Sequence, residues 1–172
     1  MLILVSQLIN QPVIIESAGS QIGRIGLPVI NPENGKLLAF HLTTGLIDRL
    51  TNSNKLIDGQ LIRDYSSQQN TLASSTVLQL SQEPKIREII KSKIKVYGAT
   101  VRTEGGNKLG QATDLLLDSE LGIVIKYYVH SLLRDYVITA EEVITIDRRG
   151  IIVNDRTPKV SSIIPEIDGA EI

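Results

Sequence analysis

Lys108-Leu-Gly-Gln-Ala-Thr-Asp-Leu-Leu-Leu-Asp118 is the stretch of the chain that decides its fold. Apolar and polar side chains alternate along much of it, as they do on a half-buried strand. Gly110 stands inside this strand, where glycine often marks a bulge or a close approach of two backbones. Asp118-Ser-Glu-Leu-Gly122 then predicts a turn before a further strand over Ile123–Val129. The stretch therefore predicts neighbouring strands of the kind that close a small barrel.

The same pattern occurs 87 positions earlier in the chain. Between residues 12 and 42 this offset needs no gap, and it places Ile14 on Val101 and Phe40 on Tyr127. It also aligns the turn residues Gly19, Gly23, Glu33 and Gly35 with Gly106, Gly110, Glu120 and Gly122. In the later part of each copy the offset falls to 81, so the first copy carries six extra residues, within Thr43–Lys55. A repeat of this kind predicts two copies of one structural unit.

Both copies have the same predicted order of elements. A strand over 12–16 or 99–103 leads into a hairpin turn, where Gly19 or Gly106 supplies the positive φ that such turns require. The strands around Gly23 and Gly110 follow, and then the turns that end at Gly35 and Gly122. The second copy continues with Thr139-Ala-Glu-Glu142, a capping-box sequence, and with strands over 143–147 and 151–154. We therefore expect a mainly all-β chain of two small β-barrels in tandem.

Between the copies the apolar spacing becomes helical. Ile86, Ile89 and Ile90 share one face, and Pro84 suits a first helical turn. These residues predict a helix of about two turns over Glu83–Lys91, which must pack on a barrel because it is too short to be stable alone. The expected organisation is a first barrel over 1–80, a linker helix over 81–95, a second barrel over 96–157 and an irregular tail over 158–172.

Composition excludes several classes of function. The net charge is −1 and aromatic residues make up only 3% of the chain, which disfavours a nucleic-acid-binding protein. The absence of cysteine excludes disulfides, thiolate metal sites and a cysteine nucleophile. No apolar run approaches the roughly 20 residues that span a bilayer. The short apolar start predicts a strand instead of a signal peptide, so we expect a cytoplasmic protein.

No residue pattern predicts an enzyme active site, a metal or a cofactor. His41 and His130 occupy non-equivalent positions in the repeat and belong to no metal-binding spacing. Asp114 and Asp118 lack the glycine-punctuated loop of a calcium site, so hydrogen bonds to nearby turns are the better interpretation. Glu141 and Glu142 fit helix capping. The glycine-rich segment 104–110 lacks the end of a P-loop and lies between strands, which favours a hairpin turn.

Two groups of residues remain as candidate contact surfaces. One is a basic cluster on the linker helix, which could contact an anion or form an ordinary solvated helix face. Its members are Lys85, Arg87, Lys91, Lys93 and Lys95. The other is a group of tyrosines, of a residue type that is enriched in protein interfaces. Its members are Tyr127, Tyr128 and Tyr136, and one of the adjacent pair should be core because neighbouring strand residues face opposite ways.

The repeated unit resembles the PRC-barrel family, named for the photosynthetic reaction-centre H subunit. The resemblance rests on the two stretches quoted above, on Gly98-Ala-Thr-Val-Arg102 and on Tyr136–Ile146, with a weaker match in the first copy through Gln21–Ile25 and Asn34–Phe40. Leu27 stands where the second copy has Asp114. The resemblance implies strongly bent β-barrels that serve as interaction modules. Relatives include the cytoplasmic domain of the H subunit and the C-terminal domain of a ribosome maturation factor.

These observations predict a non-catalytic adaptor that contacts a protein partner, including a second copy of itself as a homodimer. The alternative is an RNA-associated ribosome maturation factor that uses the basic linker helix. The first half carries only 10 charged residues against 27 in residues 81–172. For this reason we expect the partner surface on the first barrel, with its polar loop Ser66–Thr76, or beside the linker helix.

Overall fold

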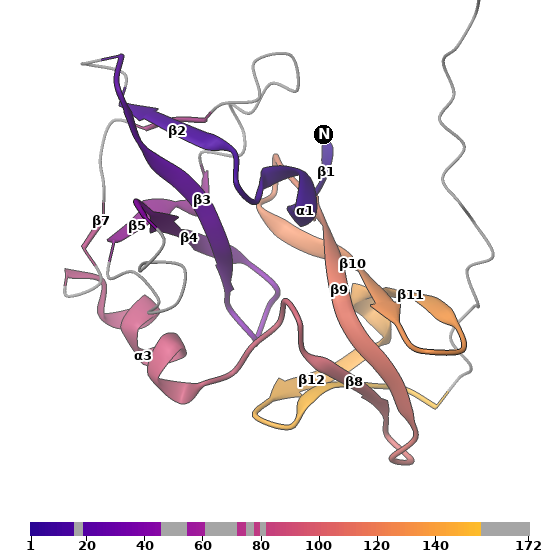
Figure 1. The fold of residues 1–172 in the computed structure, drawn as a ribbon. Helices are drawn as coiled ribbons and strands as arrows, with labels where there is room; N and C mark the ends of the chain where they lie inside the picture. The colour runs from indigo at the N-terminus through magenta and orange to yellow at the C-terminus, as the bar shows by residue number, and fades with distance from the viewer. Residues whose placement is uncertain (16–18, 46–54, 61–71, 75–77, 80–81, 156–172) are drawn as a thin grey trace, which may run out of the picture.

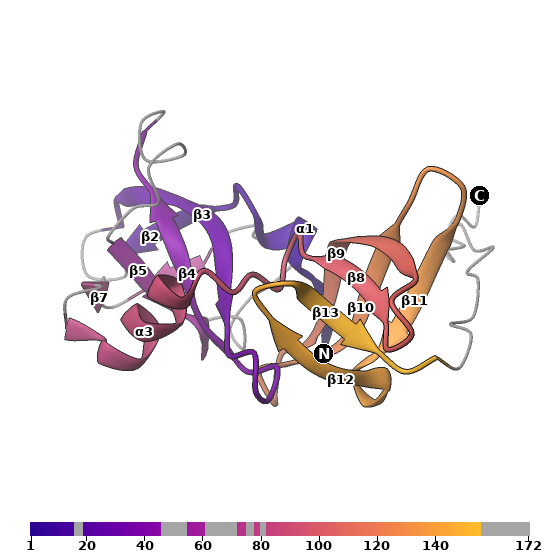
Figure 2. The same ribbon diagram turned by 90° about the horizontal axis from the view of Figure 1, so that it is seen from below.

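A computed structural model of the protein describes residues 1–15, 19–45, 55–60, 72–74, 78–79 and 82–155. Its strands form two sheets, which lie on opposite sides of the molecule in Figure 2. The first sheet has the strand order β6-β2-β3-β4-β5-β7. The second has the order β11-β10-β9-β8-β13-β12, with β1 paired to β9 beside this path. Along the chain, helix α3 follows β7 of the first sheet and precedes β8 of the second (Figure 1).

The elements have the following bounds. The first part of the chain contains β1 (Leu2–Leu4), α1 (Val5–Leu8), β2 (Pro12–Ile15), β3 (Gln21–Ile30), β4 (Leu37–Thr43), β5 (Lys55–Asp58), β6 (Leu72–Ser74) and β7 (Leu78–Gln79). The linker helix is α3 (Pro84–Ser92). The second part contains β8 (Thr100–Thr103), β9 (Lys108–Asp118), β10 (Ile123–His130), β11 (Asp135–Thr139), the 3-10 turn η3 (Ala140–Glu142), β12 (Val143–Asp147) and β13 (Gly150–Val153).

The prediction of a mainly β fold is confirmed. The helix expected over 83–91 is also found, one residue later at each end. Closed barrels are not seen: among the described strands no pairing joins β11 to β12, so the second sheet has two free edges. The expected tail over 158–172 and most of the loop 66–76 lie outside the described residues.

Strand pairing follows the offsets that the sequence predicts. Two residues that pair in the first sheet have equivalents that pair in the second sheet. The equivalent lies 87 positions later on β9 and β10, and 81 positions later on β11. The strand register also skips an equivalent residue in each sheet, Leu38 in the first and Ile125 in the second. Examples are Pro28–Phe40 with Leu115–Tyr127, Ile25–Leu42 with Ala112–Val129, and Phe40–Ile57 with Tyr127–Ile138.

In the first strand of each copy the predicted alignment is wrong by one residue. Val13 pairs with Gly23, whereas Val101 pairs with Gly110, so the structural equivalent of Val101 is Val13 and not Ile14. The same offset of 88 relates Asn10 to Gly98, which have φ angles of 70° and 76°. The first copy therefore has one extra residue between Ile14 and Gln21, in the hairpin between β2 and β3, where hydrophobic periodicity gives no signal.

A reciprocal backbone contact joins the two sheets. The residues that meet there are equivalent in the repeat. Each copy donates one backbone hydrogen bond to the other and accepts the equivalent bond from it. This is the arrangement of an isologous interface, in which one surface meets itself across a two-fold axis. The chain thus contains an internal pseudo-dimer. Leu37 N–H donates to Gly122 O (2.8 Å), Val124 N–H donates to Gly35 O (3.0 Å), and Lys36 bridges Ile123.

The segments that precede each copy are exchanged. Helix α1 comes just before β2 but packs on β9, and β1 adds to the edge of β9 through Leu2–Asp118 and Leu4–Leu116 pairs. Helix α3 comes just before β8 but packs on β3 of the first sheet, where Ile86 joins Val29 in a small apolar cluster. The pairing of β1 with the second sheet was not predicted from the repeat.

One continuous core spans both sheets. Phe40 and Tyr127, which are repeat equivalents, are 1% and 2% exposed, and both belong to the same apolar cluster as Leu8 of α1. Burial of this aliphatic surface is the main source of stability. Because the cluster crosses the junction, the two copies share a hydrophobic core instead of having one each.

Candidate interaction surfaces

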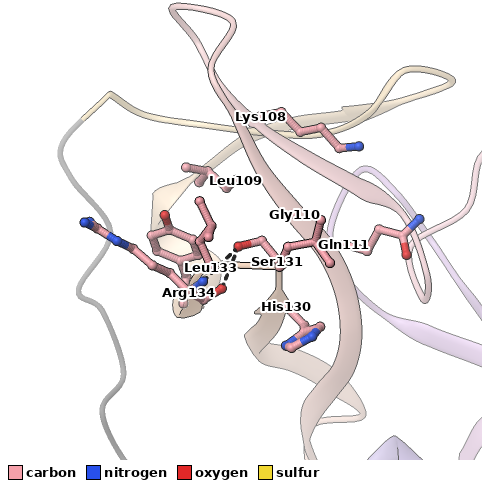
Figure 3. A pocket seen from close by; sticks show the side chains of 10 residues that line it. Lys108, Leu109, Gly110, Gln111, His130, Ser131, Leu133 and Arg134 are labelled. Atoms are coloured by element: carbon pink, nitrogen blue, oxygen red, sulfur yellow. Dashed lines mark hydrogen bonds between the residues drawn. The ribbon is translucent and has the colours of Figure 1, made fainter.

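A groove of about 610 Å³ opens where the start of β9 meets the end of β10. Its walls are Lys108–Gln111 on one side and His130–Arg134 with Tyr136 on the other (Figure 3). Gly110 forms the contact between these walls. Its φ is +151°, and a Cβ at this position would lie 2.2 Å from the carbonyl oxygen of His130. The groove therefore requires glycine here, as the sequence predicted for a close backbone approach.

The turn between β10 and β11 is closed by hydrogen bonds of a serine. The Ser131 hydroxyl donates to the Arg134 carbonyl (2.8 Å) and accepts from the Arg134 N–H (3.1 Å). A backbone bond from Ser131 N–H to the same carbonyl (3.0 Å) closes the loop. These bonds join the two residues that flank Leu132 and Leu133, so the two leucines lie on a hydrogen-bonded turn.

Leu132 and Leu133 are the most exposed large apolar side chains in the described part of the chain, at 101% and 92%. They lie at the tip of the β10–β11 hairpin, which stands out at the end of the molecule away from the first sheet (Figure 2). Burying a leucine side chain is worth about 1.5–3 kcal/mol relative to leaving it in water. Two adjacent leucines on an ordered turn are therefore a strong candidate for a contact surface.

Charges of both signs surround the leucines. Asp135 accepts a hydrogen bond from His130 Nδ1 at 2.6 Å, between side chains that are both more than half exposed. Arg134 makes no ion pair with any described residue, and its guanidinium extends away from β9 (Figure 3). Lys108 stands at the opposite rim of the groove. The surface thus has an apolar centre and a rim of mixed charge.

The three tyrosines predicted as interface residues have different environments. Tyr127 is the core member of the adjacent pair, and burial raises its pKa to about 12, so it is not part of the surface. Tyr128, on the other face of β10, is half-buried. Tyr136 is half-buried too, but it packs against the core and also lines the groove. Of the three, only Tyr136 lies beside the turn Ser131–Arg134, which we call the leucine turn.

The basic cluster on the linker helix forms a second surface. Lys85, Arg87 and Lys91 are exposed, whereas Ile86 is buried, and Lys93 and Lys95 after the helix are exposed too. The structure adds one residue that sequence reasoning missed: Arg148 Nε donates to the carbonyl of Ser92 at 3.0 Å. Arg149 is held elsewhere, because its guanidinium donates to Asp147 and lowers the pKa of that carboxyl.

The two aspartates considered as metal ligands have structural partners. Asp118 caps its own turn by accepting from Glu120 N–H (2.9 Å) and Leu121 N–H (3.1 Å). Asp114 holds α1 by accepting from Ser6 N–H (3.0 Å) and from the Ser6 hydroxyl, and its charge adds to burial in raising the pKa of Tyr97. Leu27, which stands at the equivalent position of β3 in the first copy, is exposed.

Other candidates are also accounted for within the described part of the chain. Glu142 accepts from the backbone N–H of Thr139 at 2.8 Å, as expected for a capping residue. Segment 104–107 is a hairpin turn closed by a bond from Gly106 N–H to Thr103 O (2.9 Å). The described residues contain no group of three side chains suited to a metal ion. They also contain no helix long and apolar enough to cross a membrane.

The sequence analysis did not single out Ser131–Arg134. A usable signal was present, since a pair of leucines inside a short turn between two polar residues has no core to enter. The partner surface was predicted on the first barrel or beside the linker helix, and most of the loop Ser66–Thr76 named with it lies outside the described residues. No family model matches this chain, and no curated protein is similar enough in sequence to match it.

Proposed function

We propose that the chain is a non-catalytic adaptor, built from two PRC-type β units in tandem, that binds protein through the leucine turn of the β10–β11 hairpin. The observation that carries the proposal is the near-complete exposure of Leu132 and Leu133 on a turn fixed by Ser131. An apolar centre with a polar rim is the usual anatomy of a protein interface. A preformed turn also loses little conformational entropy on binding.

The proposed assignment to the PRC-barrel type is supported by the shared strand path of the two copies. In each, the first strand pairs in parallel with a late strand, β2 with β6 and β8 with β13. The same first strand pairs in antiparallel with the glycine-containing strand that follows it. We propose in addition that each unit forms a closed barrel and that the protein is cytoplasmic.

A photo-crosslinking experiment in the native cell tests the protein-binding role. A photoreactive residue replaces Leu132 in the full chain, and a matched variant carries it at Leu121, an exposed turn leucine at 62% that lies outside the groove. We expect protein adducts from position 132 and few from position 121. Adducts at 132 that are removed by nuclease or by lipid extraction, or no adducts at all, would contradict the proposal.

RNA binding is a second candidate function, favoured by the position of Arg148 beside the end of α3. This arginine extends the basic cluster onto a second element and places it next to Lys91 and Lys93. A surface that contacts several phosphates binds RNA with a strong dependence on salt. The neutral net charge of the chain is the reason why we rank this function second.

Gel-shift measurements with ribosomal RNA at rising salt separate the two functions. The informative variant changes Lys91, Lys93 and Arg148 to glutamine, and Lys126→Gln, on the exposed face of β10, is the control. If RNA binding is the function, the triple variant has lower affinity and a shallower salt dependence while the control does not. Weak binding that is equal in all three proteins excludes this function.

A further inference from the structure

We infer that the partner at the leucine turn is a second copy of this chain, which forms a two-fold dimer by exchanging leucines between neighbouring grooves. The inference rests on the proposed function and names its partner. It depends on the fact that a projecting pair of leucines and an adjacent groove occupy the same small surface, so that one copy can give and receive the same contact.

The first step concerns shape. Leu132 and Leu133 project at the tip, while the groove of about 610 Å³ beside them is lined by apolar groups of Leu109 and Tyr136. Leu132 and Leu133 form part of the groove wall, so they cannot fill it within their own copy. An isologous interface requires one surface to be complementary to itself. A two-fold axis beside the hairpin meets this requirement, because each leucine pair then enters the groove of the other copy.

The second step concerns charge. Arg134 and Asp135 are adjacent and opposite in sign, and the Arg134 guanidinium has no carboxylate partner among the described residues. A two-fold axis that passes between these two residues places Arg134 of one copy opposite Asp135 of the other, twice in each dimer. The mixed-charge rim is thus complementary to itself, as the apolar centre is. A membrane surface would use the leucines but would gain nothing from the groove or from Asp135.

The third step concerns position and strength. The internal junction through Lys36 and Ile123 is already occupied within each chain, whereas the hairpin stands free at the far end of the molecule (Figure 2). One hairpin per copy offers a small contact compared with the roughly 1,200–2,000 Å² of stable complexes. We therefore expect a reversible dimer with a dissociation constant on the order of 10–100 μM.

Analytical ultracentrifugation of the full chain between about 1 μM and 1 mM tests this inference. We expect the mean mass to rise from monomer to dimer over this range. Leu132→Ser combined with Leu133→Ser should weaken the dimer at least about tenfold. The matched control, Leu121→Ser, should leave the dimer unchanged. A wild-type chain that remains monomeric at the highest concentration overturns the inference, and so does a dimer that the double variant does not weaken.

Exchange of the two charges provides a second test, in which the expected result is the recovery of dimer instead of its loss. Arg134→Asp makes the turn doubly acidic and Asp135→Arg makes it doubly basic, so each variant alone should associate more weakly than the wild type. Their equimolar mixture should recover a dimer that contains one chain of each kind, which also shows that both variants are folded. A mixture that associates no better than its components contradicts the two-fold arrangement.

The outcomes distinguish this inference from the proposed function. A monomeric chain that still crosslinks to a different protein through position 132 disproves the second copy and retains the adaptor role. A chain that binds anionic vesicles through the two leucines, and crosslinks to no protein, disproves both. A dimer that is unaffected by the leucine and charge variants forms through another surface, and it disproves the inference alone.

Discussion

Glycine 110 shows how a single residue shapes the candidate surface. It lets β9 pass so close to the end of β10 that a methyl group would overlap the His130 carbonyl. The equivalent Gly23 has a similar role in the first sheet, where a Cβ would lie 2.8 Å from the carbonyl oxygen of Thr43. These two glycines therefore allow the same approach of strands in both copies.

Replacing Gly110 by alanine should destabilise the protein by about 3 kcal/mol or more, because the backbone of one strand must move. The matched control is Gly98→Ala. Gly98 also has a positive φ, of 76°, but no atom lies within 4 Å of its Cβ position. The control should therefore cost only about 1–2 kcal/mol. Urea unfolding of both variants measures the difference, and equal losses would show that steric contact at Gly110 is unimportant.

Tyr127 predicts a dependence of stability on pH. Burial raises its pKa to about 12 in the folded protein, above the ordinary value of 10.0. The folded state therefore retains a proton that the unfolded state releases between these values. The contribution of Tyr127 to stability is complete below pH 10 and falls as the pH rises toward 12, by about 2–3 kcal/mol in total.

Tyr127→Phe removes this loss, and the fold accepts phenylalanine because Phe40 occupies the equivalent core position. The free energy of unfolding of the variant should fall less between pH 10 and pH 12 than that of the wild type, by about the same 2–3 kcal/mol. Tyr128→Phe, on the opposite face of β10, is the control and should keep the wild-type slope. Identical slopes in all three proteins would show that Tyr127 ionises without cost.

Among the elements, the amino-terminal segment of β1 and α1 is attached to a sheet more than one hundred residues away in the sequence. Asp114 makes the attachment by accepting from the backbone and hydroxyl of Ser6. Val5 and Leu8 supply the apolar part, since both are fully buried. The segment protects one edge of β9 that would otherwise be open to pairing with other chains.

Asp114→Ala should release this segment while the β9–β10 pair remains folded. Amide hydrogen exchange should become about tenfold faster or more at Leu4–Leu8, which corresponds to about 1.4 kcal/mol of lost local stability. Exchange in β10 should change little. Thr113→Ala, at the exposed neighbouring position on β9, is the control. Equal exchange rates in the wild type and the Asp114 variant would assign the attachment to apolar packing alone.

Sequence patterns predicted the elements better than their contacts. Glycine spacing and alternation located β9 and β10 and gave offsets that hold in the strand registers. Such patterns report which side of a strand is buried, and they carry no information about which distant segment covers it. This is why the bond from Ser6 to Asp114, the bond from Arg148 to Ser92 and the exposed leucine turn were not predicted.

On the scale of the whole molecule, the shared core predicts that both copies unfold together. The substitutions Ile57→Ala and Ile138→Ala form a matched pair at equivalent, fully buried positions, and each should cost about 2–5 kcal/mol. Circular dichroism reports all strands, whereas four of the five tyrosines lie in the second copy. Both probes should give one coincident transition in either variant. If Ile57→Ala shifts the dichroism but leaves the tyrosine signal unchanged, the copies are independent domains.

The pseudo-two-fold junction through Lys36 and Ile123 also determines how far an assembly can grow. Two identical ends would let each chain capture a neighbour at both, and association would continue into an open fibre. The two copies differ in sequence here, because residues 44–54 are six more than their equivalent, 131–135, and do not repeat the Ser131–Arg134 sequence. In the proposed dimer each chain therefore offers one such hairpin, and assembly through it stops at two chains.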